Sequence, residues 1–335
     1  MHQKNKKNTD LLAINSLFKS LSASIRKVDT QIKKNIQDEE QIITLAASHL
    51  INAKGKKLRP VLTLLFSRLL KYKGNAQFNL AVCIEFIHNA TLLHDDVIDG
   101  GKLRRGKKSA NLIWGNKISV LVGDYLLSKA FKLMVADKSI KVLQILSETS
   151  LILARGQIQD VNNLYKINLS EKKYLSIINS KTAELFRVSC YLPSIISNQP
   201  KNIQKSLNDF GYNFGMAFQL SDDILDYFGT SKKLGKIIGK DFYEGKVTYP
   251  IIHVYKHTNS INRKKLHKFF LKRKRSKKDF TDTISIMESC NTHNESIKFL
   301  DKYLKKADSS ILKFEGSRDK VYLDALVKYL HNRDK

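Results

Sequence analysis

Two stretches of the sequence place three aspartates at the spacing D-D-x-x-D within apolar surroundings. They are Asp95, Asp96, Asp99, Asp222, Asp223 and Asp226. A helix advances about 100° per residue, so the first and last aspartate of each set share one face. Grouped carboxylates in an apolar helix are costly unless a cation neutralises them, and oxygen-rich clusters suit magnesium. One copy would be weak evidence, but two copies in equivalent settings predict a pair of metal-binding motifs.

Basic residues lie close to both motifs, several of them beside glycines. Magnesium seldom sits in a cage of protein ligands alone and usually bridges carboxylates to substrate phosphates. Matching cations precede Pro60 and follow each motif; they are Lys56, Lys57, Arg59, Arg104, Arg105, Lys236, Lys240 and Lys246. Arginine suits bidentate phosphate contacts, and lysine acts as a point charge. Motifs and cations together predict a site for a metal ion and a phosphorylated substrate.

Helical periodicity dominates the elements that must position these residues. Apolar residues recur at spacings of three and four from Leu11 to Ile25. Similar patterns fall near residues 39–52, 60–71, 78–99, 117–136, 139–165, 171–191, 203–228, 283–290, 296–313 and 320–331. We see no sustained alternation of apolar and polar residues, so strands are not expected. Each of the four prolines, Pro60, Pro193, Pro200 and Pro250, falls where a helix would begin or end. The sequence predicts an all-α fold.

The bulk composition limits the other possibilities. The chain has 335 residues, of which 42% are hydrophobic, enough for a large core. Length alone favours roughly two domains, but both motifs need the same cavity, so we expect one domain over residues 1–335. The 59 Lys and Arg against 31 Asp and Glu give a formal charge of +28. Because the lysines are scattered along the chain, most of this charge is interpreted as solvated surface.

The densest basic run, residues 263–278, admits two interpretations. It could be a nucleic-acid or localisation patch. Leu266, Phe269, Phe270 and Leu271 interleave with its cations, however, which favours a surface helix with one apolar face. Neither a zinc-finger spacing nor a Gly-aromatic RNA-binding signature accompanies the run. We therefore expect no nucleic-acid partner.

The cysteines and the N-terminus point to a reducing compartment. Cys83, Cys190 and Cys290 are far apart and odd in number, so they predict neither a disulfide framework nor a metal site. The polar N-terminal residues lack the apolar stretch of a signal peptide, and no apolar run approaches the length of a membrane span. A cytoplasmic protein is expected.

The motifs resemble those of the trans-isoprenyl diphosphate synthase family, specifically the bacterial octaprenyl diphosphate synthases. The likeness is continuous from about residue 50 to 255 and weaker at both ends. Besides the aspartate motifs it includes Glu85-Phe86-Ile87-His88, Leu121-Val122-Gly123-Asp124-Tyr125, Lys181-Thr182-Ala183 and Gly215-Met216-Ala217-Phe218-Gln219. The resemblance implies an all-α bundle around a deep central cavity, with the two motifs facing each other across its mouth, and a homodimer.

The resemblance also implies roles for individual residues. Asp95, Asp96 and Asp99 would bind magnesium and the allylic diphosphate, and Asp222, Asp223 and Asp226 would hold another ion opposite. The allylic diphosphate, with farnesyl diphosphate as the expected primer, would contact Arg104, Lys181, Lys236 and Lys246. Isopentenyl diphosphate would be held by Lys56, Arg59, His88 and Arg105. Thr182 and Gln219 would line the space where the cation forms. His94 is expected to serve packing or to support its neighbours.

The implied chemistry follows from charge. Magnesium neutralises the leaving diphosphate, so that the allylic C–O bond can ionise. The double bond of isopentenyl diphosphate then attacks the cation in a site closed to water, and the departed diphosphate takes the proton. No side-chain nucleophile is required. The long apolar product, for a quinone side chain, would leave into lipid, which implies a transient membrane contact.

Product length depends in this family on bulk below the first motif. Ala90 and Thr91, the fifth and fourth residues before Asp95, are not aromatic. Small residues there leave the tunnel open and imply a long, octaprenyl-like product. The other interpretation is that Ala90 only allows close helix packing, with Phe131 and Met134 forming the tunnel floor.

The sequence departs from the family pattern in three places. Gly100, Gly101 and Lys102 stand where acidic residues are usual after the first motif. Only Gly55 remains of the consecutive glycines that often open the basic motif before Pro60. The stretch from Gly156 to Asp160 resembles short-chain relatives.

Three other functions remain open at this stage. A shorter-chain synthase making geranylgeranyl or farnesyl diphosphate would share every site residue and differ at the tunnel floor. A non-catalytic subunit of a heteromeric prenyltransferase would typically lose aspartates, whereas this chain keeps all six. A basic nucleic-acid-binding protein would show steep salt dependence and indifference to replacement of Asp95 or Asp99.

Overall fold

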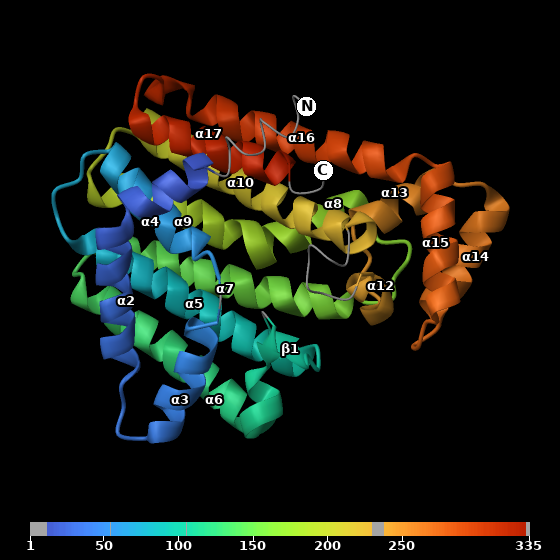
Figure 1. Ribbon diagram of the computed structural model, residues 1–335, viewed down its shortest axis with the longest axis horizontal. Coiled ribbons are helices and arrows are strands. Elements are labelled where there is room, and N and C mark those ends of the chain that lie inside the picture. Colours follow the sequence, from blue (N-terminus) through green and yellow to red (C-terminus); the bar gives the residue numbers. More distant parts are fainter. Residues whose placement is uncertain (1–11, 54, 105, 230–237, 333–335) are drawn as a thin grey trace.

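The computed structural model describes residues 12–53, 55–104, 106–229 and 238–332, which are almost entirely helical (Figure 1). After a helical segment at residues 12–20, the N-terminal half contains α2 (Ser22–Ile36), α3 (Gln41–Ile51), α4 (Leu58–Leu69), α5 (Ala76–Ile98), α6 (Ala110–Ala136) and α7 (Ile140–Asn162). The C-terminal half contains α8 (Glu171–Ile178), a π-helical turn (Asn179–Ala183), α9 (Glu184–Ile196), α10 (Lys201–Phe228), α12 (Lys240–Glu244), α13 (Tyr249–His257), α14 (Ser260–Leu271), α15 (Lys277–Ser289), α16 (Thr292–Ser310), a 3-10 turn (Leu312–Phe314) and α17 (Arg318–His331). The predicted all-α fold is confirmed. Within these ranges, every helix falls short of the length or the apolarity that crossing a bilayer requires.

The helices that carry the two aspartate motifs are held by extensive packing. α5 packs along α6 and α4, and α10 packs against α9 and α16 (Figure 1). Fully buried aromatic side chains join these layers: the ring of Phe66 lies 5.2 Å from that of Phe210, and Phe186 lies 5.6 Å from Phe214. Edge-to-face pairs of this kind add to the apolar burial that holds the helices in place. α5 and α10 are therefore rigid supports for the motifs at their C-terminal ends.

Short polar residues begin several helices, as their side chains satisfy the free N–H groups of the first turn. The hydroxyls of Ser139, Ser170 and Ser317 accept such bonds at the starts of α7, α8 and α17. At the start of α15, Ser276 and Asp279 form a reciprocal capping box. Several observed boundaries still differ from those expected from periodicity: α2 extends to Ile36 rather than Ile25, α6 begins at Ala110 rather than near residue 117, and α15 begins at Lys277 rather than near residue 283.

Two local features differ from the prediction. Residues Leu103–Arg104 (β1) and Lys107–Lys108 (β2) form a short antiparallel hairpin, although strands were not expected. Two-residue strands are too short to show alternation. The expectation that Pro193 marks a helix end was wrong, because α9 continues to Ile196. Because proline has no N–H, Pro193 cannot donate to the backbone carbonyl of Ser189, four residues earlier. The hydroxyl of Thr63 on α4 donates to this carbonyl instead, at 3.0 Å.

A third difference concerns the helix expected over residues 171–191. It is divided by the π-helical turn Asn179–Ala183, which contains Lys181 and Thr182. Such single turns often occur at functional sites because they displace side chains from the regular helical face. Periodicity gives no sign of it, since the apolar residues on either side keep helical spacing.

Candidate functional site

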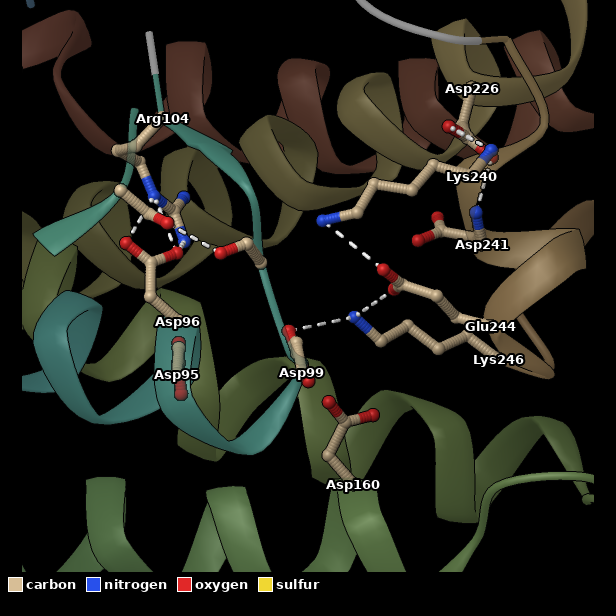
Figure 2. Close-up of polar contacts among 12 residues, drawn as sticks. Asp95, Asp96, Asp99, Arg104, Asp160, Asp226, Lys240, Asp241, Glu244 and Lys246 are labelled. Carbon is tan, nitrogen blue, oxygen red and sulfur yellow. Dashed lines mark hydrogen bonds and ion pairs between the residues drawn. The ribbon is translucent and has the colours of Figure 1, made fainter. Parts of the chain in front are cut away.

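The first motif lies in the last turn of α5, with Asp99 as the residue that follows the helix. Asp96 is buried, and its carboxylate forms a bidentate ion pair with the guanidinium of Arg104. Nε of Arg104 lies 3.0 Å from Oδ1 and 3.2 Å from Oδ2 of Asp96. Arg104 comes from β1, so the unexpected hairpin is what brings it to the motif (Figure 2). The geometry neutralises one of the three carboxylates within the protein itself.

The glycines that depart from the family pattern form the turn between α5 and this hairpin. Gly100 has a φ of +60°, a conformation that favours glycine. The amide of Gly101 donates to the carbonyl of Asp96 at 2.9 Å, and a Cβ at Gly101 would lie 3.1 Å from the Asp96 carboxylate. Small residues here allow the chain to fold back tightly over Asp96.

Lys181 faces the first motif from the π-helical turn. Its ammonium lies 2.7 Å from a carboxylate oxygen of Asp160 on α7 and 4.0 Å from one of Asp95. Burial raises the pKa of Asp95 above its usual value, and the charge of Lys181 opposes that shift. Gly156 permits this approach, because a Cβ there would lie 2.8 Å from the backbone nitrogen of Lys181. Lys181 is therefore a fixed cation between two carboxylates.

A chain of hydrogen bonds runs from the same turn to the second motif. The hydroxyl of Thr182 donates to the Gln219 side-chain carbonyl at 2.7 Å, and the Gln219 amide donates to Asp223 at 2.7 Å. The phenol of Tyr174, on α8, donates to the other oxygen of Asp223. Burial raises the pKa of Asp223, and the nearby Asp241 carboxylate adds to the rise. Asp222, the preceding residue, is half-buried on α10.

The last aspartate of the second motif supports a short helix. The Asp226 carboxylate accepts the backbone N–H groups of Lys240 and Asp241, at 3.1 and 2.9 Å, at the start of α12. Burial, followed by the charge of Asp241, raises the pKa of Asp226 to about 8. The hydrogen bonds from the two backbone amides favour the charged carboxylate and oppose this rise. Asp226 thus orients the segment that follows the second motif.

That segment returns a lysine to the first motif. The ammonium of Lys246 lies 3.3 Å from Asp99 and 2.9 Å from Glu244, while Lys240 lies 3.2 Å from Glu244 (Figure 2). Burial lowers the pKa of Lys246, but the carboxylates of Asp241, Asp99 and Glu244 outweigh it and raise the pKa above its usual value. Lys246 therefore stays charged between the two motifs.

Arg275, from the basic run expected to form a surface helix, packs against the segment that contains α12 and Lys246. It is only 8% exposed, and its guanidinium lies 4.8 to 5.5 Å from the ring centroids of Phe270, Tyr165 and Phe242. It also donates to the carbonyl of Tyr243 at 3.1 Å. The amide of Tyr165 donates to the carbonyl of Gly245 at 2.8 Å, so these contacts fix the backbone next to Lys246.

Of the residues expected to hold isopentenyl diphosphate, Arg59 lies on α4, His88 lies on α5, and Lys56 precedes α4. Nη1 of Arg59 lies 3.3 Å from Nε2 of His88, and the guanidinium lies 4.2 Å from the centroid of the Phe186 ring. Lys56 instead donates to the phenol of Tyr329 on α17 at 2.7 Å. The structure brings Arg59 and His88 together and places Lys56 against the C-terminal helix. Arg105 and Lys236, also predicted, lie outside the described residues.

A pocket of about 150 Å³ opens beside Asp223 of the second motif. Five predicted residues line it: Lys181, Thr182, Gln219, Asp223 and Lys246. Tyr174, Asp160 and Asp241 line it too, although the sequence analysis gave them no role. Asp160 ends the stretch from Gly156 that resembles short-chain relatives, and Asp241 follows the candidate cation Lys240. An isolated carboxylate gives no spacing signal.

The residues considered for chain length differ in burial. Ala90 is 2% exposed, and the Thr91 hydroxyl donates to the carbonyl of His88 at 2.7 Å. Met134 is fully buried, whereas Phe131 is 36% exposed at the surface of α6. Of the two alternative floor residues, only Met134 lies in the interior of this chain. His94 contacts the backbone carbonyl of Val120 at 3.2 Å and lies 3.4 Å from the Asp124 carboxylate.

Comparisons with known proteins agree with this geometry. The polyprenyl synthetase family model matches residues 40–287. Octaprenyl diphosphate synthase of Escherichia coli is 40% identical over 69% of this chain and 71% of that protein. Heptaprenyl diphosphate synthase component 2 of Bacillus subtilis is 32% identical over 97% of this chain and 94% of the Bacillus protein. The crystal structure of a Caulobacter crescentus polyprenyl synthase, complexed with calcium and isoprenyl diphosphate, superimposes with a TM-score of 0.91 at 36% identity, covering 96% of this chain and 98% of that one.

Proposed function

Since this chain belongs to the polyprenyl synthetase family, we propose that it condenses isopentenyl diphosphate with an allylic diphosphate to give a long-chain, all-trans polyprenyl diphosphate. The observation that carries the proposal is the bridge between the motifs. Lys181 and Lys246 line one pocket together with Asp160 and Asp223. The same two lysines reach Asp95 and Asp99 of the first motif. Alternating charges of this kind suit a metal-bound diphosphate.

The substrates are assigned to two sets of residues. The allylic diphosphate, with farnesyl diphosphate as primer, would contact Arg104, Lys181, Lys246 and, outside the described residues, Lys236. Isopentenyl diphosphate would be held by Arg59 and His88, which already face each other, together with Lys56 and Arg105. Lys56 would exchange the phenol of Tyr329 for a phosphate oxygen.

The family uses a divalent metal ion, and we propose magnesium for this chain. The six motif aspartates offer only carboxylate oxygens, the donors that a hard divalent ion prefers. In the described part of the chain, no three His, Cys, Asp or Glu side chains already form a metal-binding cluster. Three of the motif carboxylates already have partners within the protein. Asp96 pairs with Arg104, Asp99 pairs with Lys246, and Asp226 accepts hydrogen bonds from amides of α12. Asp95, Asp222 and Asp223 complete the donor set, and substrate phosphates would supply further ligands.

The chemistry rests on charge and orientation rather than on a nucleophile. When bound, magnesium stabilises the charge that develops on the leaving diphosphate. Lys181 and Lys246, both held by carboxylates, provide fixed positive charge for the same oxygens. The hydroxyl of Thr182 donates its proton to the side-chain carbonyl of Gln219. The lone pairs of the Thr182 oxygen therefore remain available to an allylic cation. These residues stabilise both charges that separate when the C–O bond ionises.

A long product is favoured by the small residue below the first motif. Ala90 is buried and offers little bulk one turn below Asp95. We propose an octaprenyl-like length and a role in quinone side-chain synthesis. The alternative of a shorter product differs only in where the tunnel ends, which for this chain would be at Met134.

The assembly we propose is a homodimer formed through α6 and α7. Ten of the 19 exposed large hydrophobic residues in the described chain lie on these two adjacent helices: Leu112, Ile113, Val120, Leu121, Phe131, Val135, Ile140, Leu151, Ile158 and Val161. So many exposed apolar side chains on one helix pair are typical of an interface. A different polypeptide could cover them instead, which light scattering of the pure chain would distinguish.

The organisation of the chain supports two further assignments. The described site residues run from Lys56 to Lys246 and come together from many helices, so we propose that residues 1–335 form one domain. Cys83, Cys190 and Cys290 are unpaired, and the first two are buried. Free cysteines favour a reducing compartment, in agreement with the expected cytoplasmic location.

Product analysis tests the function. Purified protein is incubated with farnesyl diphosphate, labelled isopentenyl diphosphate and magnesium, and the dephosphorylated products are separated by length. We expect a ladder ending in a long product, which chelation of the metal abolishes and magnesium restores. Asp95→Asn should remove activity, while Asp308→Asn, at a half-exposed position on α16, should not. A folded, magnesium-loaded wild-type protein that elongates nothing would instead indicate a non-catalytic subunit.

A further inference from the structure

The basic segment at residues 260–278 has a face that the proposed chemistry does not use. It contains ten Lys or Arg and no Asp or Glu. Figure 1 shows α14 as the outermost element at one end of the molecule, beyond α12. Leu266, Phe269 and Phe270 form its buried face, and the ring of Phe270 lies 5.7 Å from that of Phe242 on α12. The opposite face of α14 points to solvent.

That opposite face carries a mixed stripe of two aliphatic residues and two lysines. Ile261, Lys264, Lys268 and Leu271 follow each other at spacings of three, four and three, which places them within about 80° on the helix. Ile261 is 77% exposed and Leu271 is 70% exposed. Lys264 and Lys268 are exposed and make no ion pair with the described residues. We call these four residues the outer stripe.

The arginines of the segment are mostly turned away from this face. Arg263 donates to the backbone carbonyls of Tyr255, Lys256 and Thr258 at the end of α13. Arg275 is buried among aromatic rings. The bidentate contacts that give specific nucleic-acid recognition need free guanidinium groups. What remains outside is mainly lysine charge beside aliphatic side chains, the combination that suits a diffuse anionic lipid surface.

We propose that the outer stripe docks this enzyme on an anionic lipid bilayer, with Lys264 and Lys268 among the headgroups and Ile261 and Leu271 entering the interface. Each cation near such a surface strengthens partitioning roughly 5-fold. Neighbouring exposed cations, including Arg273, Lys274, Lys277 and Lys278, add to the attraction.

Part of the reasoning rests on the proposed function. A long polyprenyl tail gains free energy for every methylene transferred from water to lipid. Release of the product into water is therefore unfavourable, and an enzyme held at a bilayer offers the tail an apolar destination. The docking surface itself is defined by α14 and can be tested without catalysis.

Vesicle flotation of the full chain is the test. Binding is compared between vesicles of phosphatidylcholine and vesicles that also contain phosphatidylglycerol, at low and high salt. The variants are Lys264→Gln/Lys268→Gln and Ile261→Ser/Leu271→Ser. The matched control, Lys302→Gln/Lys305→Gln, removes the same charge from exposed positions on α16. Prenyl transfer in detergent is measured in parallel, and no outer-stripe variant should change it.

We expect wild type and control to float with anionic vesicles, with partitioning lowered about 30-fold by the lysine variant and at least 10-fold by the aliphatic variant. Equal loss in the control would overturn the proposal, because general charge would explain the binding. Tighter binding to a random DNA duplex than to vesicles, lost with the same lysines, would also overturn it. Flotation without any prenyl transfer would leave the docking surface supported and refute the proposed function instead.

Discussion

The ammonium of Lys246 lies 3.3 Å from the carboxylate of Asp99, although 147 positions separate the two residues in the sequence. This contact joins the segment after the second aspartate motif to the last aspartate of the first. Glu244 holds the same ammonium at 2.9 Å, so Lys246 is positioned before any substrate binds. A cation whose place is fixed by the protein therefore links the segment after the second motif to the first motif.

Replacing Lys246 by Met should reduce kcat/KM for the allylic diphosphate by about 10²–10³-fold, the usual effect of losing one preorganised electrostatic group. Lys246→Arg should retain part of the activity. Lys240→Met serves as the control, since Lys240 also contacts Glu244 but is half-exposed. Steady-state kinetics would contradict the assignment if the Lys240 variant lost as much activity as the Lys246 variant.

The pair of Asp96 and Arg104 should behave as one unit. Each of Asp96→Asn and Arg104→Gln breaks the same buried bidentate contact, so the double variant should be little worse than either single one. A double-mutant cycle of the free energy of unfolding, without substrate, should give a coupling of about 0.5–3 kcal/mol. Additive effects would show that Arg104 does not neutralise Asp96 in the free enzyme.

Arg275 should act on the site through the segment that carries Lys246. Arg275→Leu removes a hydrogen bond and the contacts with three rings, and should lower the free energy of unfolding by about 1–3 kcal/mol. It should also raise KM for the allylic substrate more than Lys274→Leu, a neighbouring exposed control. A variant that loses stability but keeps wild-type KM at low temperature would limit Arg275 to a structural role.

The chain-length assignment is tested at Ala90. Ala90→Phe should shorten the product because a buried aromatic ring closes the tunnel one turn below Asp95, at a cost in stability of about 1–3 kcal/mol. Met134→Ala should leave the length unchanged or increase it, and Ala90→Ser should give the wild-type distribution. Chromatography of the dephosphorylated products measures the chain length made by each variant. An unchanged length in a folded Ala90→Phe variant would place the floor at Met134.

How much of this site was predictable differs from residue to residue. The D-D-x-x-D spacing and its apolar setting were enough to locate both motifs on helices, because a helical face depends only on local sequence. The partner of Asp96 was not predictable, since Arg104 reaches it through a two-residue hairpin that leaves no pattern. Asp226 bonds to backbone amides of α12, and backbone groups have no sequence signature.

Other residues could be found only from tertiary structure. Tyr174 and Asp160 reach the pocket from α8 and α7, and each is a single polar residue in an ordinary helical pattern. Arg275 belongs to the basic run that was interpreted as a surface helix, whereas the fold buries its side chain in an aromatic cluster. The family resemblance supplied roles for Lys181, Thr182 and Gln219, but the π-helical turn that presents the first two became visible only in the structure.

Gly156 should be required for the placement of Lys181. A Cβ at this position would lie 2.8 Å from the backbone nitrogen of Lys181 and the carbonyl carbon of Ser180, so Gly156→Ala must push α7 away from the π-helical turn. We expect a loss of about 1–3 kcal/mol in unfolding free energy and a lower kcat, because the distance between Lys181 and Asp160 would change. Gly74→Ala is the control, since its Cβ would meet only the movable ring end of Tyr72. If Gly156→Ala kept wild-type kcat while Lys181→Met lost it, Lys181 would tolerate displacement and the close approach of α7 would serve packing alone.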